Sequence, residues 1–479
     1  MNYYAKDCEL VLALVCPVGV NLDDVETRLR SLFRQFNYEM NMIHLSEVAK
    51  SETGSQDATP VNEVERLDAG MKLGTSLREK HGCGEIMAMF AIKAINAIRE
   101  YDKGAPKPKK RVVHVIRSLK HADEVDALRQ VYGPGFFLLG VSSSLESRKY
   151  YLKELKGVPD SEIERLIERD DKEEKPLGQQ TRKVFEVADA FVTTDDTERL
   201  SKQLSRVVDI LFSKPVEPPT AEEYAMFMAY AASLRSADLG RQVGAVLVND
   251  RGDIVSTGAN DVPKFGGGLY WPGDSDARDH VWGCDYNERE KRVIAEDVAK
   301  KILGDDARRE EVDAAIESLK SSKLMNITEY GRAVHAEMEA LLQASRNGTA
   351  VNDCVLYATT YPCHNCAKHV VAAGVKSVVY VEPYPKSYAT HLHSDAINDD
   401  GSNDEEKVEF RQFVGVGPRR FIDLFSMHLS SGRGLVRKEA GRLVEWERAS
   451  AELRVPMGPL SYLDLEVSAL NDLADLMEG

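Results

Sequence analysis

Apolar and polar residues follow one another along residues 1–213 in a pattern typical of an α/β domain. An apolar run at 10–15 leads into a turn with a proline and a glycine, and an amphipathic helix is predicted at 23–36. Further strands are predicted at 111–116, 135–141 and 187–192, and a further helix at 197–212. Strands that alternate with helices favour a parallel sheet with crossover helices. The charged run at 170–175 is predicted to be a solvated face.

A proline-rich segment interrupts this pattern. Residues 213–220 read SKPVEPPT, with three prolines in eight positions. Proline cannot continue a helix and favours an extended connector. We therefore predict a first domain at 1–213 and a linker at 214–220.

The pattern of a second α/β domain begins after the linker, and we predict this domain at 221–394. Helices are expected at 221–234, near His335 and near Cys363, and strands at 243–248, 254–258, 354–359 and 377–381. Residues 395–406 are acidic and nearly free of apolar side chains, which indicates a solvated loop. We expect 395–479 to be this loop followed by a C-terminal extension that packs on the second domain.

The composition and charge of the chain indicate which kinds of molecule it can bind. The 479 residues are 43% hydrophobic, enough for at least two cores, and the formal net charge is −16. An acidic chain is a poor match for broad, stable nucleic-acid binding, whereas a few arginines suffice to hold a free nucleotide. Seven scattered cysteines fit a reducing cytoplasm. No apolar run approaches the roughly 20 residues of a membrane helix, so no membrane partner is expected.

The strongest chemical signal is a pair of short motifs in the second domain. His335-Ala336-Glu337 precedes an apolar helix face, and in the later segment Pro362-Cys363-His364-Asn365-Cys366 the first cysteine is 28 residues after His335. Together they match the H-x-E and P-C-x-x-C signature of zinc nucleobase deaminases. One imidazole and two thiolates leave the fourth position of a tetrahedral Zn²⁺ open for water.

The predicted positions of these residues suit catalysis. Both ligand groups are expected at the first turn of a helix, where free backbone N–H groups and the helix dipole favour thiolates. Zinc lowers the pKa of bound water toward roughly 7, far below that of free water. Glu337 is not a ligand and is predicted to move protons to the ring nitrogen and the leaving ammonia.

Other interpretations of these residues stay open. A C-x-x-C pair with one further ligand also suits a structural zinc site or a redox pair. His364, His369 and Cys354 are interpreted as packing or surface residues. His280 and Cys284 would form a second zinc site with His391 or His393, or would simply be packing residues.

Residues 221–385 resemble the deoxycytidylate deaminase branch of the cytidine deaminase-like superfamily. Besides the two zinc motifs, the resemblance rests on three segments in the family's order: SLRS at 233–236, RQVGA at 241–245 and GANDVP at 258–263. It implies a sheet of about five strands sandwiched between helices. It also implies that Asn260 contacts the deoxyribose and that Arg235 and Ser236 approach the 5′-phosphate; an exposed helix arginine is the alternative for Arg235.

The chain departs from this family at two places. Glu339 stands where the family usually has asparagine, two positions after the catalytic glutamate. The stretch between Pro263 and Tyr330 is longer than in small deoxycytidylate deaminases and contains YWPG at 270–273 and HVWGC at 280–284. The details of substrate fit are therefore open.

The first domain is similar to P-loop nucleoside-phosphate kinases in its opening strand, turn and helix and in the segments QQT at 179–181 and ADAFV at 188–192. The phosphate-binding consensus fails, because Gly19 is followed by Val20 and Asn21 where lysine and a hydroxyl residue are required. Phosphoryl transfer is not expected. A regulatory nucleotide or an oligomer-forming role remains.

A kinase-like domain joined to such a deaminase resembles the bacterial antiviral deoxycytidylate deaminases. This resemblance implies a cytoplasmic homo-oligomer that deaminates dCMP, dCTP or both and so depletes deoxycytidine nucleotides during phage infection. Two alternatives remain. One is a deaminase that acts on cytosine or adenine within a nucleic acid. The other is a non-catalytic nucleotide sensor on a deaminase scaffold.

Overall fold

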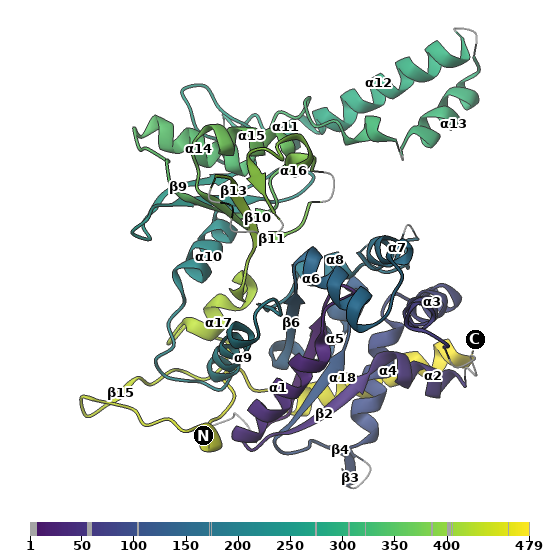
Figure 1. The fold of residues 1–479 in the computed structure, drawn as a ribbon, viewed down its shortest axis with the longest axis vertical. Coiled ribbons are helices and arrows are strands. Elements are labelled where there is room, and N and C mark those ends of the chain that lie inside the picture. Colours follow the sequence, from purple (N-terminus) through teal and green to yellow (C-terminus); the bar gives the residue numbers. More distant parts are fainter. Residues whose placement is uncertain are drawn as a thin grey trace. The chain divides into compact units, whose positions relative to one another are not determined.

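The computed structural model of the chain describes residues 7–54, 60–102, 105–171, 173, 175–273, 275–304, 307–320, 322–384, 387–399, 404, 406–457 and 459–478. The chain divides into two compact units. The first is Met1–Glu223 together with Val414–Gly479, and the second is Tyr224–Phe413. Each contains its own six-stranded sheet (Figure 1). The molecule is thus a mixed α/β protein with two sheets that contain parallel strands.

The first unit is built on a sheet with the strand order β14-β7-β6-β1-β5-β2. The central strand β1 pairs in parallel with β5 on one side and β6 on the other, and all six of its residues are buried. A strand covered on both faces needs apolar residues at every position, which explains the LVLALV run. The strands are β1 Leu10–Val15, β2 Glu39–His44, β5 Val112–Arg117, β6 Phe136–Ser142, β7 Ala190–Thr193 and β14 Gly415–Val416, with a separate pair β3 Glu100–Asp102 and β4 Ala105–Lys107.

Helices connect these strands. The first, α1 (Leu22–Gln35), buries Leu22, Val25, Leu29 and Phe33, which recur at the spacing of one helix face. The remaining helices are α2 Leu45–Thr53, α3 Glu63–His81, α4 Ile86–Ala97, α5 Ala122–Tyr132, α6 Leu145–Tyr150, α7 Asp160–Asp171, α8 Thr181–Glu186, α9 Thr197–Leu211, α17 Phe421–Phe425 and α18 Pro459–Glu478.

The end of α7 corrects the interpretation of 170–175 as a solvated face. Asp170 is only 1% exposed and forms an ion pair of 2.7 Å with Lys120. Its other carboxylate oxygen accepts the backbone N–H of Val18 at 2.8 Å. A charge run in a sequence does not show which of its members has an internal partner. Residues 172 and 174 of this run lie outside the described residues.

The C-terminal segment corrects a second expectation. Residues 395–479 were predicted to pack on the second domain, but from Val414 onward the chain belongs to the first unit. Strand β14 adds to the edge of the first sheet by pairing with β7, and α18 packs against α4 and α5. Five of the twelve residues in the predicted acidic loop at 395–406, namely 400–403 and 405, lie outside the described residues.

A buried ion cluster anchors α18 in the first unit. Arg99 forms ion pairs with Glu9, at 2.9 Å, and with Glu466 of α18, and all three side chains are fully buried. Tyr462 of α18 donates a hydrogen bond of 2.8 Å to Glu9. Buried charges persist only when they are paired, so this helix docks through specific partners as well as through apolar contact.

The second unit has a mixed sheet with the strand order β12-β13-β11-β10-β8-β9. Strands β10, β11, β13 and β12 run in parallel, and β8 and β9 are antiparallel neighbours at the other edge. The strands are β8 Gly244–Val248, β9 Ile254–Ala259, β10 Val355–Thr360, β11 Ser377–Glu382, β12 Ile397–Asn398 and β13 Val408–Gln412. The helices are α10 Ala221–Ser233, α11 Asp279–Trp282, α12 Tyr286–Leu303, α13 Arg309–Leu319, α14 Ala336–Arg346, α15 His364–Ala372 and α16 Ala389–Leu392.

Two glycines let helices approach this sheet closely. A Cβ on Gly244 would lie 1.9 Å from the carbonyl oxygen of Ala229 in α10, and one on Gly258 would lie 2.0 Å from that of Ala336 in α14. In the register of the β8–β9 pair, Gly244 is opposite Ala259, and the next residue, Ala245, is opposite Gly258. The two glycines are therefore diagonal neighbours on adjacent strands. Both helices therefore rest on the strand backbone itself.

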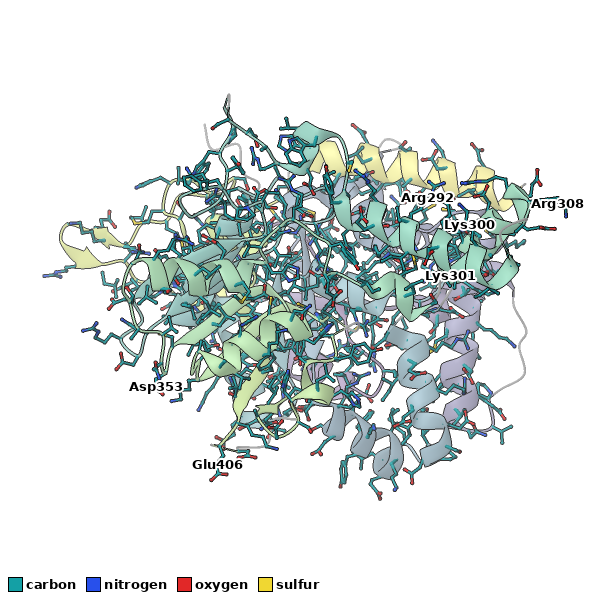
Figure 2. All side chains as sticks on the ribbon, turned by 90° about the horizontal axis from the view of Figure 1, so that it is seen from above. Arg292, Lys300, Lys301, Arg308, Asp353 and Glu406 are labelled. Atoms are coloured by element: carbon teal, nitrogen blue, oxygen red, sulfur yellow. The ribbon has the colours of Figure 1, made fainter. Side chains whose placement is uncertain are left out.

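The long polar stretch between Pro263 and Tyr330 contains a helical arm. Figure 1 shows α12 and α13 as a pair that extends from the second unit. The two helices are in contact, and Ala295, Ala299 and Val312 are buried in them. Arg292, Lys300, Lys301 and Arg308 project from the arm in Figure 2. No helix of the described residues is both long enough and apolar enough to span a membrane.

Candidate active site

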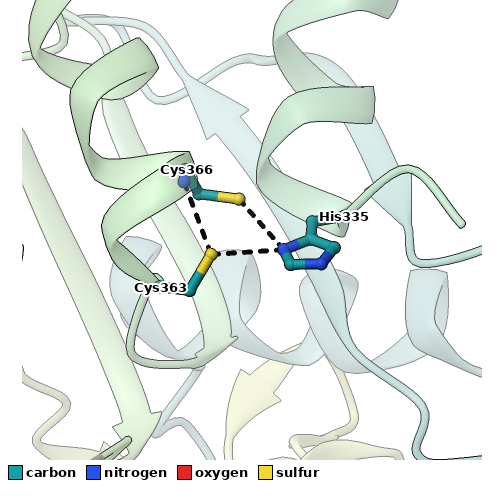
Figure 3. A group of neighbouring side chains, drawn as sticks. All are labelled: His335, Cys363 and Cys366. Carbon is teal, nitrogen blue, oxygen red and sulfur yellow. Dashed lines mark hydrogen bonds between the residues drawn. The ribbon is translucent and has the colours of Figure 1, made fainter. Parts of the chain in front are cut away.

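Two helix starts bring His335, Cys363 and Cys366 together. His335 is the N-cap residue of α14, and Cys363 is the N-cap residue of α15, whose first turn contains Cys366. The Nδ1 atom of His335 lies 3.3 Å from the Sγ atom of Cys363 and 3.3 Å from that of Cys366 (Figure 3). One donor atom from each residue lies within 4.8 Å of the others. Soft sulfur and imidazole donors in this number suit Zn²⁺.

Hydrogen bonds among the donor residues change their pKa values. A hydrogen bond with Cys363 raises the pKa of His335 to about 9. Hydrogen bonds with Cys366 and His335 lower the pKa of Cys363 to about 4. The Sγ atom of Cys363 also accepts the backbone N–H of Cys366 at the start of α15. A thiolate is thus favoured at Cys363, and the thiolate is the form that binds a metal.

Glu337 lies in the first turn of α14, two residues after His335, and is only 4% exposed. Burial raises the pKa of this carboxyl group above its ordinary value. Glu337 lines the same cavity as His335 and Cys363. Glu337, which the sequence predicted as the proton carrier, therefore lies in the same site as the predicted zinc ligands His335 and Cys363.

The cavity at this site has a volume of about 250 Å³. Its walls come from separate segments of the second unit: 238–243, Asn260, 279–287, 328–337, the end of β10 and the segment after β11. The lining includes Asp238, Arg241, Asn260, Asp279, Asp285, Asn287, Thr328, Arg332, Thr360, Tyr361 and Tyr384 besides the residues named above. A concave site with a few convergent polar groups is the usual form of a small-molecule site.

Asn260 lines the cavity, as a substrate contact would. Its side chain also organises the preceding loop, since Nδ2 donates to the carbonyl of Arg241 at 2.7 Å and Oδ1 accepts the N–H of Val243 at 2.6 Å. Ser236 is buried, donates to the carbonyl of Asn260 at 2.6 Å and is not among the residues that line the cavity. The structure thus places Ser236 behind Asn260.

Arg235 is also outside the lining of the cavity. Its guanidinium stacks over the Trp271 ring at 3.9 Å and donates to the carbonyl of Tyr270 at 3.0 Å. The cationic side chains that do line the cavity, besides His335, are Arg241 and Arg332. Neither was predicted as a site residue, although Arg241 opens the RQVGA segment and Arg332 lies three positions before His335.

The structure also shows the surroundings of the residues that depart from the family pattern. Glu339, where the family usually has asparagine, is buried and forms an ion pair with Arg346. The His280 ring faces Asp276 at 3.8 Å. Among the described residues, His280 and Cys284 do not join His391 or His393 in a metal-ligand group, and only His335, Cys363 and Cys366 form one.

Comparison with known proteins shows what this region is similar to. Residues 219–382 match the family model of the cytidine and deoxycytidylate deaminase zinc-binding region. ComE operon protein 2 of Bacillus subtilis (strain 168) is 29% identical over 167 residues, which cover 35% of this chain and 75% of that protein. Deoxycytidylate deaminase of Pongo abelii is 27% identical over 206 residues, which cover 43% of this chain and 86% of that protein.

A solved structure is also similar to this chain. The dCMP deaminase from the cyanophage S-TIM5, in apo form, is 18% identical with a TM-score of 0.24, and the match covers 41% of this chain and 98% of that one.

The site and these relatives define the class of protein. The chain is a hydrolytic deaminase with a zinc cofactor. More particularly, its residues 219–382 match the zinc-binding region of the cytidine and deoxycytidylate deaminases and are similar to proteins named deoxycytidylate deaminase.

Proposed function

We propose that this protein deaminates deoxycytidine nucleotides, converting dCMP, dCTP or both to the corresponding deoxyuridine nucleotides. The observation that carries the proposal is the single cavity lined by His335, Cys363, Glu337 and Asn260. The relatives from Pongo abelii and Enterobacteria phage T4 are both named deoxycytidylate deaminases, which supports a nucleotide substrate.

Each site residue has a distinct task in this proposal. His335, Cys363 and Cys366 hold Zn²⁺, which supplies Lewis-acid activation of water at neutral pH. Glu337 moves two protons in turn: the first passes from the attacking water to the ring nitrogen, and the second passes from the new hydroxyl on C4 to the departing amino group. A bond forms between C4 and the water oxygen, the bond between C4 and the exocyclic nitrogen breaks, and ammonia leaves. Asn260 contacts the deoxyribose.

Purified full chain incubated with dCMP, dCTP and deoxycytidine tests this function. We expect loss of cytosine absorbance and release of ammonia with at least one nucleotide. Glu337→Gln should abolish turnover while zinc remains bound, because the ligands are intact. No turnover of any nucleotide by zinc-loaded protein would reject the function. If Glu337→Ala left the biological effect intact, a non-catalytic sensor would replace it, and cytosine loss in single-stranded DNA or RNA would indicate a nucleic-acid deaminase.

For the first unit we propose a kinase-like nucleotide-binding role in regulation. A cavity of about 460 Å³ lies at the carboxyl ends of β1, β2 and β5, where open α/β sheets bind ligands, and is lined by residues such as Gly19, His44, Arg117 and Lys156. The turn after β1 is closed by the Val18–Asp170 hydrogen bond, so binding is proposed beside it. Equilibrium titration of the full chain with ATP, GTP and dTTP should show binding that Arg117→Gln weakens. No binding of any of the three leaves an assembly role.

We further propose that the protein is a cytoplasmic homo-oligomer that depletes deoxycytidine nucleotides in antiviral defence. The support is the pairing of a deaminase unit with a separate α/β unit in one chain. Light scattering should give a multiple of the chain mass of 53.3 kDa. Phage-infected cells should lose deoxycytidine nucleotides with the wild-type chain but not with Glu337→Gln, and equal pools in the two strains would reject the defence role.

A further inference from the structure

The catalytic cavity contains few groups that can neutralise a phosphate. Its lining includes four carboxylates, from Asp238, Asp279, Asp285 and Glu337, and the guanidinium groups of Arg241 and Arg332. A nucleotide brings at least one phosphate, which the carboxylates repel. Among the residues that the structure describes, these two arginines are the cationic lining residues that are not proposed zinc ligands, so they are the candidates that decide the position of a bound phosphate.

Arg241 is held at the wall formed by the ends of β10 and β11. Its Nη2 atom donates to the hydroxyl of Thr360 at 3.1 Å and to the carboxylate of Glu382. Its carbonyl oxygen accepts the side chain of Asn260, which is proposed to contact the sugar. In the described part of the chain, Nη2 is the atom of this guanidinium that forms hydrogen bonds. Its other donors therefore remain for a ligand next to the sugar position.

Arg332 is held from the side of the inserted stretch. Nη1 donates to Asp279 at 2.6 Å, and Nη2 donates to the carbonyl of Ala277 at 2.9 Å. The guanidinium carbon lies 3.8 Å from the centre of the Trp282 ring. A stacked and hydrogen-bonded guanidinium loses little rotational freedom when a ligand arrives, and its planar fork still has N–H groups for phosphate oxygens.

Arg235 provides a natural comparison. It stacks on Trp271 at 3.9 Å, almost the distance at which Arg332 stacks on Trp282, and it also donates to a backbone carbonyl. Yet Arg332 lines the cavity and Arg235 does not. The two residues thus share their local chemistry and differ in access to the site.

We propose that Arg241 and Arg332, and not Arg235, bind the 5′-phosphate and make the enzyme specific for nucleotides over the nucleoside. This inference rests on the proposed deamination of deoxycytidine nucleotides. Arg332 depends on Asp279, Ala277 and Trp282, all within the stretch that is longer than in small deoxycytidylate deaminases. The insertion therefore has a role in substrate recognition, because it positions one of the two phosphate-binding groups.

The test compares a substrate with a phosphate and one without. The ratio of kcat/KM for dCMP to kcat/KM for deoxycytidine is measured for the wild type, Arg241→Gln, Arg332→Gln and the matched control Arg235→Gln. Loss of a charged hydrogen-bonding partner should reduce this ratio about 10- to 100-fold in the first two variants. Arg235→Gln should leave the ratio within about twofold of the wild type, because any effect on folding acts on both substrates.

Two further measurements keep the test decisive. Arg332→Lys retains the charge opposite Asp279, so it should fold and still lower the ratio, since lysine lacks the planar fork. Calorimetric titration of the Glu337→Gln chain measures binding without turnover. Adding Arg241→Gln or Arg332→Gln to it should weaken binding of dCMP and leave binding of deoxycytidine unchanged.

The outcomes separate the inference from the proposed function. A wild type that deaminates no nucleotide rejects the function itself. A wild type that deaminates dCMP, with an unchanged ratio in both arginine variants, overturns the inference alone. A reduced ratio in one variant only overturns the two-arginine arrangement and assigns the phosphate to that arginine. A reduced ratio in Arg235→Gln comparable to the others also overturns it.

Discussion

The backbone N–H of Val18 donates a hydrogen bond of 2.8 Å to the carboxylate of Asp170, 152 residues further along the chain. In phosphate-binding loops, backbone N–H groups of the turn after the first strand face an anion from outside. Here an internal carboxylate meets one of them, and Lys120 neutralises that carboxylate at 2.7 Å. The turn therefore carries its own anion and is stabilised without a bound phosphate.

This relationship predicts that Asp170→Asn lowers the free energy of unfolding. The substitution leaves Lys120 without its counter-charge in a largely buried position, and we expect a loss of about 2–3 kcal/mol. Urea denaturation measures it. The neighbouring Asp171 pairs with Arg182 on a more exposed surface, so Asp171→Asn should cost no more than about 1 kcal/mol. Equal losses in the two variants would contradict the role given to Asp170.

The buried ion cluster predicts acid sensitivity of the first unit. Burial alone would raise the pKa of Glu9, but the hydrogen bond from His114 and the charge of Arg99 outweigh it and lower the pKa to about 2. Because the folded pKa is depressed, the stabilisation is fully present above the unfolded value of about 4.5 and is lost as the pH falls toward 2. It amounts to about 3 kcal/mol.

Urea denaturation between pH 6 and pH 2.5 measures this contribution. The free energy of unfolding should fall more steeply with acidification in the wild type than in Glu9→Gln, which lacks the titrating group. Parallel curves for the two proteins would show that Glu9 does not titrate with a depressed pKa.

The convergence of two helix starts predicts the zinc stoichiometry. Cys363→Ser and Cys366→Ser each remove one of three protein ligands. Since even residues that only support a ligand cost about 10- to 100-fold in metal affinity, these losses should exceed 100-fold. Cys354 is buried in the core of the same unit but lies outside the ligand group, so Cys354→Ala should retain one zinc per chain. The zinc content of each variant is measured after dialysis. Zinc retained by both serine variants would show that Cys363 and Cys366 are not ligands.

The close approach of α14 to β9 predicts that Gly258 supports the metal site indirectly. In Gly258→Ala, the new Cβ would lie 2.0 Å from the carbonyl oxygen of Ala336, so α14 must shift together with its N-cap residue His335. We expect a loss of about 1–3 kcal/mol in stability and weaker zinc binding. Gly70→Ala, with no atom within 4 Å of the new Cβ, should instead stabilise its helix by about 0.5–1 kcal/mol. Thermal melting and zinc titration report both effects.

Local chemistry was sufficient to predict from the sequence the group of donors that the structure brings together at His335, Cys363 and Cys366. Two helix starts contain the four residues His335, Glu337, Cys363 and Cys366. A zinc site with an open position needs particular residue types at short spacings, and both can be read from the sequence. Strands β1, β5, β6 and β7 of the first unit were predicted for the same reason, although β7 begins at Ala190 and not at 187, and β2 was not predicted. Strand β1 lies at 10–15 as expected, and β5 and β6 are each displaced by one residue from the predicted bounds.

The tertiary structure alone decided those features that depend on contacts between residues distant in the sequence. The sequence alone predicted that His335, Cys363 and Cys366 would come together, and it determined the class of chemistry, because both depend on residues within one or two helix turns. It did not indicate that Asp170 would be buried, that the segment from Val414 would complete the first unit, or that Arg241 and Arg332 would reach the cavity while Arg235 would not. An arginine has the same charge everywhere, and only long-range packing determines which ring or carboxylate holds it and which cavity it lines.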